Sequence, residues 1–215
     1  MSEVLRLLLA NWLLIASGMA LTVMTTTSFY LITAYTPTYG SEALKLPQTI
    51  VQLVTFFVGL SNVLWLPVGG MMTDRYGARP VMLWVTLATV LTAYPAMLFL
   101  VADPSFFKLL AVLLLFSVFF GLYNGALIPL LAEIMPAKVR TTAFSLAFVT
   151  ATAIFGGFTP AICTYLVQAT GNRAAPGLWL TMAAVISFVA AFLVPRVLRS
   201  AEMPGGSLAA ELRKA

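Results

Sequence analysis

The sequence predicts an all-α integral membrane protein with six transmembrane helices. Three observations predict this fold class. Of the 215 residues, 61% are hydrophobic and 9% are charged, whereas soluble domains are about 45–50% apolar and about 25% charged. The apolar residues gather in six long runs, and the basic residues lie at the ends of those runs. A soluble domain of this size has too few polar side chains to cover so much apolar surface.

Each apolar run is long enough to cross a bilayer, because about 20 helical residues span the hydrocarbon core. Charged side chains occur only near the ends of the runs, as Glu133 and Arg196 do. The predicted spans are 10–36, 49–70, 81–101, 109–134, 141–167 and 177–197. Residues 1–197 are therefore expected to form one six-helix bundle. The polar segment 198–215, with a Pro-Gly-Gly helix breaker, is expected to be a flexible cytoplasmic tail.

The distribution of basic residues predicts the orientation of the bundle. Three bases lie on one side, at Lys45, Lys108 and Arg173. Nine lie on the other, at Arg6, Arg75, Arg79, Lys138, Arg140, Arg196, Arg199, Arg213 and Lys214. Cytoplasmic loops carry the excess of Lys and Arg, so both termini are expected in the cytoplasm. Because the bases lie at helix ends, the net charge of +5 indicates membrane topology and not nucleic-acid binding.

Several polar side chains lie near the middle of the spans. Polar groups in a membrane usually face a partner or a watery cavity. Threonines at 25–27, 150 and 152 are expected to bond to neighbouring helices or to their own helix backbone. For Asn62 and Asn124, lining a cavity and bonding between helices are equally open. The predicted substrate-binding residues of the spans are Tyr30, Asn62, Tyr123 and Asn124.

Glycine and proline patterns predict close packing and bending of two spans. Gly121 and Gly125 form a small-xxx-small pattern that lets two helices approach closely, and Pro129 follows one turn later. Pro160, after the pair Gly156-Gly157, predicts a kink in the fifth span.

The chain lacks the groups that an intramembrane enzyme needs. It has no histidine and one cysteine, and no acidic or basic side chain lies in the middle of a span. No nucleophile has a base partner and no set of metal ligands is evident, so we expect no enzyme activity, metal or cofactor.

A charged loop follows the second span. In "GGMMTDRYGARP", Gly70 is expected to allow close packing and Gly77 to allow a tight reversal of the chain. The loop acid, Asp74, can meet the positive N-terminus of another helix. The loop is therefore interpreted as a cytoplasmic gate that breaks when helices rock, with a simple topology anchor as the alternative. Its residues are Gly70, Asp74, Arg75, Gly77 and Arg79.

This loop resembles the signature G-x-x-x-D-R-x-G-R-R of the major facilitator superfamily, except that Ala78 stands where the first of the two final arginines is expected. A second cytoplasmic loop, "AEIMPAKVR", is similar to the family pattern Glu-x-x-Pro-x-x-x-Arg. The residues that match it, and join the gate by resemblance, are Glu133, Pro136 and Arg140. The family has twelve helices in two halves, each a 3+3 inverted repeat. Six spans fit one half.

Longer stretches, among them "TTTSFYLITAYTPTYG" and "FFGLYNGALIPLLAEIMPAKVRTTAFSLAF", resemble the C-terminal half of citrate–proton symporters. These belong to the metabolite–proton symporter branch, which also includes tricarballylate carriers. The resemblance implies a half or fragment of a proton-coupled secondary transporter in the bacterial inner membrane. Its partners would be citrate or tricarballylate, protons and a matching N-terminal half, with alternating access at a midplane site.

Two alternatives remain open at this point. One is a membrane component that does not transport, either an assembly partner or a truncated gene product. The other is a homodimeric six-helix carrier. A tricarboxylate carries up to three negative charges, and the middle of these spans has no charge to neutralise it. We therefore expect that the chain alone does not take up citrate.

Overall fold

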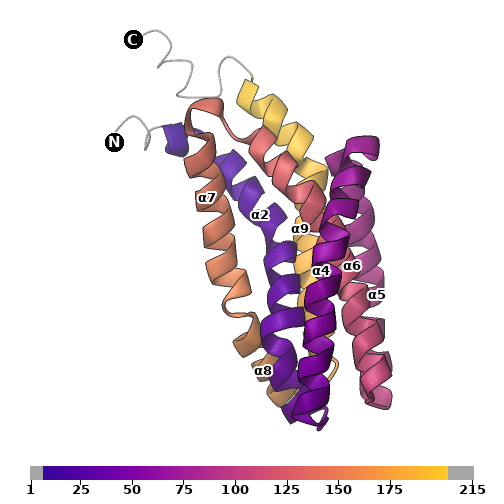
Figure 1. The fold of residues 1–215 in the computed structure, drawn as a ribbon. Coiled ribbons are helices and arrows are strands. Elements are labelled where there is room, and N and C mark those ends of the chain that lie inside the picture. The colour runs from indigo at the N-terminus through magenta and orange to yellow at the C-terminus, as the bar shows by residue number, and fades with distance from the viewer. Residues whose placement is uncertain (1–6, 203–215) are drawn as a thin grey trace.

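In the computed structural model, the residues described, 7–202, fold into a bundle of long helices (Figure 1). Side chains are described up to residue 195. Between these limits the chain contains helices and turns but no strand. The elements are α2 (Trp12–Phe29), η1 (Tyr30–Tyr35), α3 (Thr36–Thr38), η2 (Tyr39–Ala43), α4 (Gln48–Tyr76), α5 (Ala78–Ala102), α6 (Phe106–Ile134), η3 (Ala137–Val139), α7 (Arg140–Ala151), η4 (Thr152–Gly156), α8 (Thr159–Thr170) and α9 (Ala175–Glu202).

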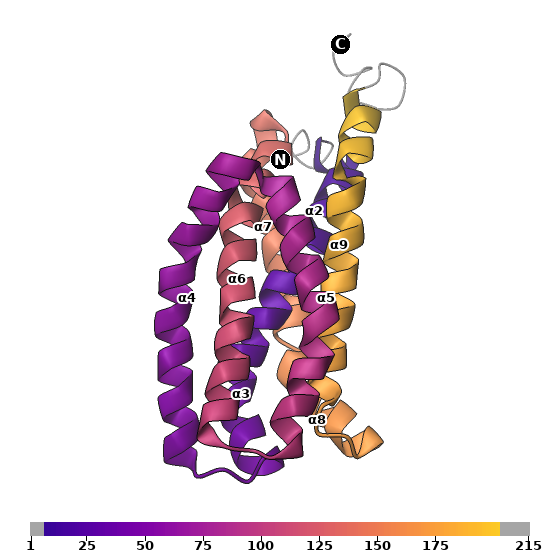
Figure 2. The same ribbon diagram turned by 90° about the vertical axis from the view of Figure 1, so that its right-hand side faces the viewer.

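Among the described residues, six helical segments are long and apolar enough to cross a membrane, which confirms the predicted fold class. They are Trp12–Ala43, Gln48–Tyr76, Ala78–Ala102, Phe106–Ile134, Ala137–Thr170 and Ala175–Pro195. The segments run beside one another along the bundle (Figures 1 and 2). The start of α2, the α4–α5 junction, the α6–α7 junction and the end of α9 lie at one end of the bundle. We call this the loop end.

Each of the six helical segments extends beyond at least one of its predicted boundaries. The first continues past residue 36 to Ala43, because the π-helical turns η1 and η2 carry the helix through Pro37. The last helix, α9, continues past residue 197 to Glu202. The helix breaker at Pro204 and the remainder of the predicted tail lie outside the described residues.

The fifth span is interrupted just before the proline that predicts a kink. Helix α7 ends at Ala151, the π-helical turn η4 follows, and α8 begins at Thr159. Pro160 lies in the first turn of α8, where a missing N–H costs no hydrogen bond. The proline therefore starts the second segment of the span, and η4 carries the irregularity.

The predicted close packing of the small-xxx-small pattern is present between α4 and α6. A Cβ added at Gly121 would lie 2.5 Å from the Cβ of Trp65, and one added at Gly125 would lie 2.6 Å from the backbone nitrogen of Gly70. On α4, a Cβ added at Gly69 would lie 2.6 Å from the carbonyl oxygen of Gly121. These glycines let the two backbones approach more closely than side chains permit.

Candidate translocation surface and loop-end residues

Tyr30 belongs to the first span, and its side chain lies against the fifth span. It begins the π-helical turn η1, and its ring is so close to Gly156 that a Cβ added there would lie 2.8 Å from Cε2. The side chain is partly exposed in a cavity of about 300 Å³. The other residues that line this cavity are Phe148, Val149, Thr152, Ala153 and Gly157. Of the four predicted binding residues, Tyr30 therefore faces open space.

Asn62 is 6% exposed and bonds between helices. Its Oδ1 accepts a hydrogen bond from Ser117 on α6 at 2.6 Å, and Ser117 Oγ lies 2.9 Å from Ser61 Oγ. The three side chains form a polar cluster between α4 and α6. Of the two roles left open for Asn62, bonding between helices is the one observed in this structure.

Tyr123 is fully buried, and its hydroxyl donates to the carbonyl of Leu21 at 2.7 Å. Ser187 of α9 contacts the same turn of α2. Its hydroxyl donates to the carbonyl of Ala20 at 2.8 Å and accepts from the N–H of Met24 at 3.0 Å. Side chains from α6 and α9 therefore bond to the backbone of α2 near the middle of that helix.

Three buried polar atoms have no hydrogen-bond partner within the described part of the chain: Thr25 Oγ1, Thr27 Oγ1 and Asn124 Oδ1. The expectation for the threonines holds at Thr26, which donates to Val23 O at 3.1 Å, and at Thr152. It is wrong for Thr25 and Thr27. Each of these unpaired buried polar atoms costs free energy in the bundle as it stands.

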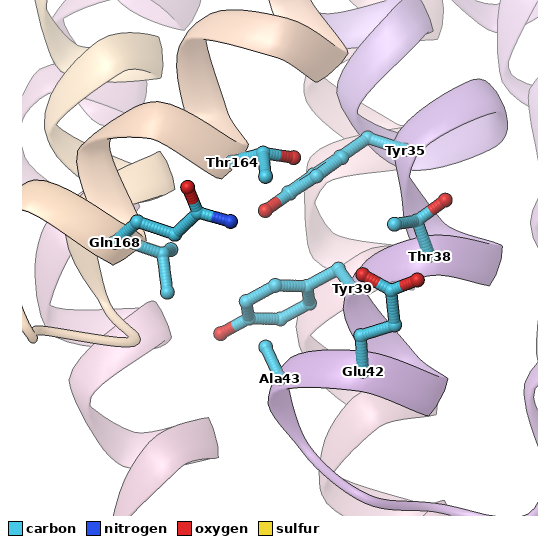
Figure 3. A pocket seen from close by; sticks show the side chains of 8 residues that line it. Tyr35, Thr38, Tyr39, Glu42, Ala43, Thr164 and Gln168 are labelled. Carbon is cyan, nitrogen blue, oxygen red and sulfur yellow. The ribbon is translucent and has the colours of Figure 1, made fainter.

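A polar pocket that the sequence did not predict lies at the other end of the bundle. It has a volume of about 220 Å³, between the end of the first span and α8 (Figure 3). Its lining is Tyr35, Thr38, Tyr39, Glu42, Ala43, Thr164, Val167 and Gln168. The Tyr39 hydroxyl donates to the carbonyl of Arg173 at 2.7 Å. The available signal was the i, i+4 spacing of Tyr35 with Tyr39 and of Thr38 with Glu42.

The loop after the second span is a single residue. Gly77 has φ 87° and links Tyr76 at the end of α4 to Ala78 at the start of α5, as its predicted role in a tight reversal requires. The Cβ position of Gly70 is open, so the close contact with α6 depends on Gly69 and Gly125 instead.

The charged residues of this loop have different surroundings. Asp74 is exposed and, within the described part of the chain, has neither an ion pair nor a hydrogen bond from its side chain. The guanidinium of Arg75 lies over the ring of Tyr76, 5.3 Å from its centre. Arg79 reaches α9, where its Nε donates to Ala191 O at 3.1 Å.

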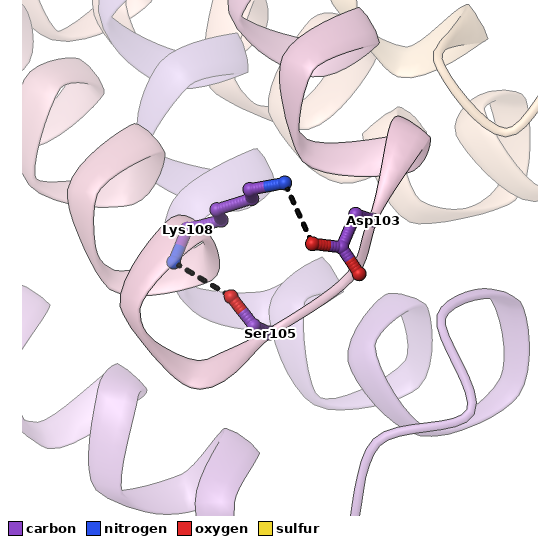
Figure 4. A network of polar contacts seen from close by, with 3 residues as sticks. All are labelled: Asp103, Ser105 and Lys108. Carbon is purple, nitrogen blue, oxygen red and sulfur yellow. Dashed lines mark hydrogen bonds and ion pairs between the residues drawn. The ribbon is translucent and has the colours of Figure 1, made fainter.

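The second loop-end sequence contributes three more predicted gate residues. Glu133 lies in the last turn of α6 and Arg140 begins α7, and both are exposed; Pro136 precedes η3. Among the side chains described, the one ion pair joins Lys108 to Asp103 at 3.0 Å, at the end opposite the loop end (Figure 4). Nothing in the described part of the chain therefore joins the predicted gate charges to one another.

The α5–α6 turn is held by that ion pair and by a helix cap. The Ser105 hydroxyl accepts from the backbone N–H of Lys108 at 3.4 Å (Figure 4). The Lys108 ammonium also lies 5.0 Å from the centre of the Phe99 ring. No group of three or more His, Cys, Asp or Glu gathers among the residues that the structure describes.

Comparison with known proteins identifies the family. The family model described as Major Facilitator Superfamily matches residues 9–213. The chain belongs to the major facilitator superfamily. The family and the relatives below are transporters, and the six apolar helices make the chain a multi-pass membrane protein.

Two citrate–proton symporters are similar to this member of the superfamily. It is 50% identical over 190 residues to the citrate–proton symporter of Klebsiella pneumoniae, covering 88% of this chain and 43% of that protein. It is 50% identical over 188 residues to that of Salmonella typhi, covering 87% and 43%. The ectoine/proline transporter ProP of Corynebacterium glutamicum is 29% identical over 180 residues, covering 84% and 36%. The chain spans less than half the length of these relatives.

Proposed function

We propose that the chain forms one six-helix half, the C-terminal one, of a proton-coupled secondary transporter for citrate or a related tricarboxylate. The observation that carries this proposal is the 50% identity to two citrate–proton symporters over 88% and 87% of the chain. The matched part is 43% of each relative, which is consistent with six of twelve helices. Residues 1–197 and the beginning of the following segment would form the bundle.

The proposed substrate surface includes Tyr30 and Asn124. Tyr30 is supported by its partly open cavity between the first and fifth spans. Asn124 is supported by its unpartnered buried Oδ1, which implies a partner in some state of the carrier. Asn62 and Tyr123 bond to protein groups, so they would contact substrate only after the helices shift.

A matching N-terminal half is the proposed partner. All charged residues of the six spans lie near span ends, at Glu42, Asp74, Arg75, Arg79, Lys108, Glu133, Lys138 and Arg140. A tricarboxylate in the membrane needs cationic or strongly donating partners, and proton coupling needs a titratable group. The second half would supply both.

The proposed location is the bacterial inner membrane, with both termini in the cytoplasm. The nine-to-three distribution of bases predicted from the sequence supports this orientation because cytoplasmic loops are rich in Lys and Arg. The loop-end residues Asp74, Arg75, Glu133 and Arg140 would then belong to a cytoplasmic gate that closes against the other half.

A chimera tests this function. The segment of the Klebsiella pneumoniae symporter that matches this chain is replaced by the chain, and uptake of labelled citrate is measured in membrane vesicles. We expect saturable uptake that depends on an inward proton gradient. Competition with unlabelled citrate and tricarballylate distinguishes the two substrates. An inserted chimera that takes up neither would contradict the proposal.

The gate is tested by Asp74→Asn in the same chimera. The substitution keeps the size of the side chain and removes its charge, and with it any attraction to a helix N-terminus, so uptake should fall by about two- to fivefold. Insertion should be unchanged, as measured by the amount of chimera in the membrane. Asp103→Asn, at the opposite end, is the matched control. Equal uptake by both variants and the parent would reduce Asp74 to a topology anchor.

A further inference from the structure

Pro195 leaves a backbone carbonyl of α9 without its usual partner. The residue lies inside α9, which runs from Ala175 to Glu202. In an α-helix each N–H bonds to the carbonyl four residues earlier, and proline has no N–H. The carbonyl of Ala191 therefore lacks the donor that residue 195 would otherwise supply. Ala191 is fully buried, and an unpaired carbonyl inside a membrane protein is strongly unfavourable.

Arg79 supplies the missing donor from another helix. Its Nε donates to Ala191 O at 3.1 Å, and one terminal nitrogen donates to the next carbonyl, Phe192 O, at 3.3 Å. The guanidinium carbon also lies 6.0 Å from the centre of the Phe192 ring. The planar fork of arginine suits two neighbouring acceptors, whereas a lysine ammonium offers no such fork.

We propose that Arg79 and Pro195 form an interhelical clamp in which Arg79 satisfies the carbonyl that Pro195 leaves free, so that α5 and α9 are fixed to each other at the loop end. This role is distinct from the cytoplasmic gate. Within the described part of the chain, the Arg79 guanidinium contacts α9, whereas Asp74 is exposed and unpaired there. Gly77, with φ 87°, separates the two functions. The α4–α5 junction therefore combines a fixed residue on α5, Arg79, with the proposed gate residues on α4, Asp74 and Arg75.

A double-mutant cycle tests the clamp, with the melting temperature of the purified full chain in detergent as the measurement. Arg79→Met keeps the length of the side chain and removes every donor, so the melting temperature should fall by roughly 3–8 °C. Pro195→Ala restores an N–H that can bond to Ala191 O, and alanine favours helix, so this variant should melt no lower than the parent. In the Pro195→Ala background, Arg79→Met should lower the melting temperature by less than half as much.

Two further variants separate the clamp from simpler roles. Arg75→Met removes the same charge nearby, but in the described part of the chain Arg75 contacts no carbonyl of α9, so its effect should be the same with and without Pro195→Ala. Arg79→Lys keeps the charge and loses the fork, so it should recover only part of the loss. The clamp is rejected if the Arg79→Met and Pro195→Ala effects are additive, or if Arg79→Lys recovers the parent melting temperature.

Discussion

Hydroxyl groups from two other helices bond to the middle of α2. Tyr123 and Ser187, from α6 and α9, bond to the backbone of α2 over Ala20 to Met24. Lipid is as apolar as the helix surface, so the hydrophobic effect does not drive helices together in a membrane. Interhelical hydrogen bonds therefore contribute to their association, together with close packing. The position of α2, and with it the direction of Tyr30, therefore depends on a few polar side chains from other spans.

Ser187→Ala should destabilise the bundle by about 1 kcal/mol. The substitution removes the donor to Ala20 O and the acceptor of the Met24 N–H, and the cost stays small because these two backbone groups can bond to each other. Thermal unfolding in detergent measures the change. Ser145→Ala, at an exposed serine of α7, is the control and should change stability little. Equal effects of the two substitutions on the melting temperature would contradict a stabilising role for the hydrogen bonds of Ser187.

At the residue scale, the sequence predicted polar groups but not their partners. Asn62 and Tyr123 are noticeable in apolar spans, whereas Ser117 and Ser187 are single serines of a kind that membrane helices commonly tolerate. Their partners lie 55 and 163 residues away in the chain, and only the packing of the helices brings them together. The polar pocket around Tyr35 and Tyr39 was missed because the first span was predicted to end at residue 36.

At the scale of elements, glycine determines how α4 and α6 pack. The close contact follows from Gly69 on α4 and from Gly121 and Gly125 on α6, at each of which an added Cβ would overlap the facing helix. This pairing was predicted from the small-xxx-small pattern on α6, but the pattern alone did not identify the partner helix. The continuation of the first span through Pro37 was not predicted, because proline, glycine and serine in that stretch favour a stop and the π-helical turns that accommodate them carry no sequence signal.

Gly125→Ala should destabilise the α4–α6 contact by about 1–3 kcal/mol, because its new Cβ would overlap the backbone of α4. Gly59→Ala on α4 is the matched control, since nothing lies within 4 Å of its Cβ position. That substitution should be neutral or stabilising, because alanine favours helix over glycine. The melting temperatures of the two variants check this, and a Gly125→Ala variant as stable as the control would contradict the packing described.

For the whole molecule, the six spans and the family followed from composition and motifs, because apolar length and charge position are properties of the chain itself. Which residues touch a substrate did not follow, since such contacts depend on the parts of the carrier that face this bundle. The orientation is a prediction from the base count that labelling can test.

Single cysteines in a Cys163→Ser background test the orientation. Cysteines introduced by Gln48→Cys, Ala102→Cys and Ala169→Cys, at exposed sites opposite the loop end, should react with an impermeant reagent added outside the cell. Those introduced by Ala137→Cys and Thr141→Cys, exposed at the loop end, should react only after permeabilisation. Reversed labelling would reject the orientation and the cytoplasmic gate together.

Uptake of labelled citrate by the chain itself tests the central claim, that it is one half of a proton-coupled carrier. Vesicles contain the chain alone, or the chain with the separately expressed remainder of the Klebsiella pneumoniae symporter, with and without an imposed pH gradient. The chain alone should give no uptake above that of empty vesicles, because the interior of its spans has no charge to hold the anion or the proton. The two pieces together should give saturable, gradient-dependent uptake. Robust, saturable, gradient-dependent uptake by the chain alone would contradict the account and favour a homodimeric six-helix carrier.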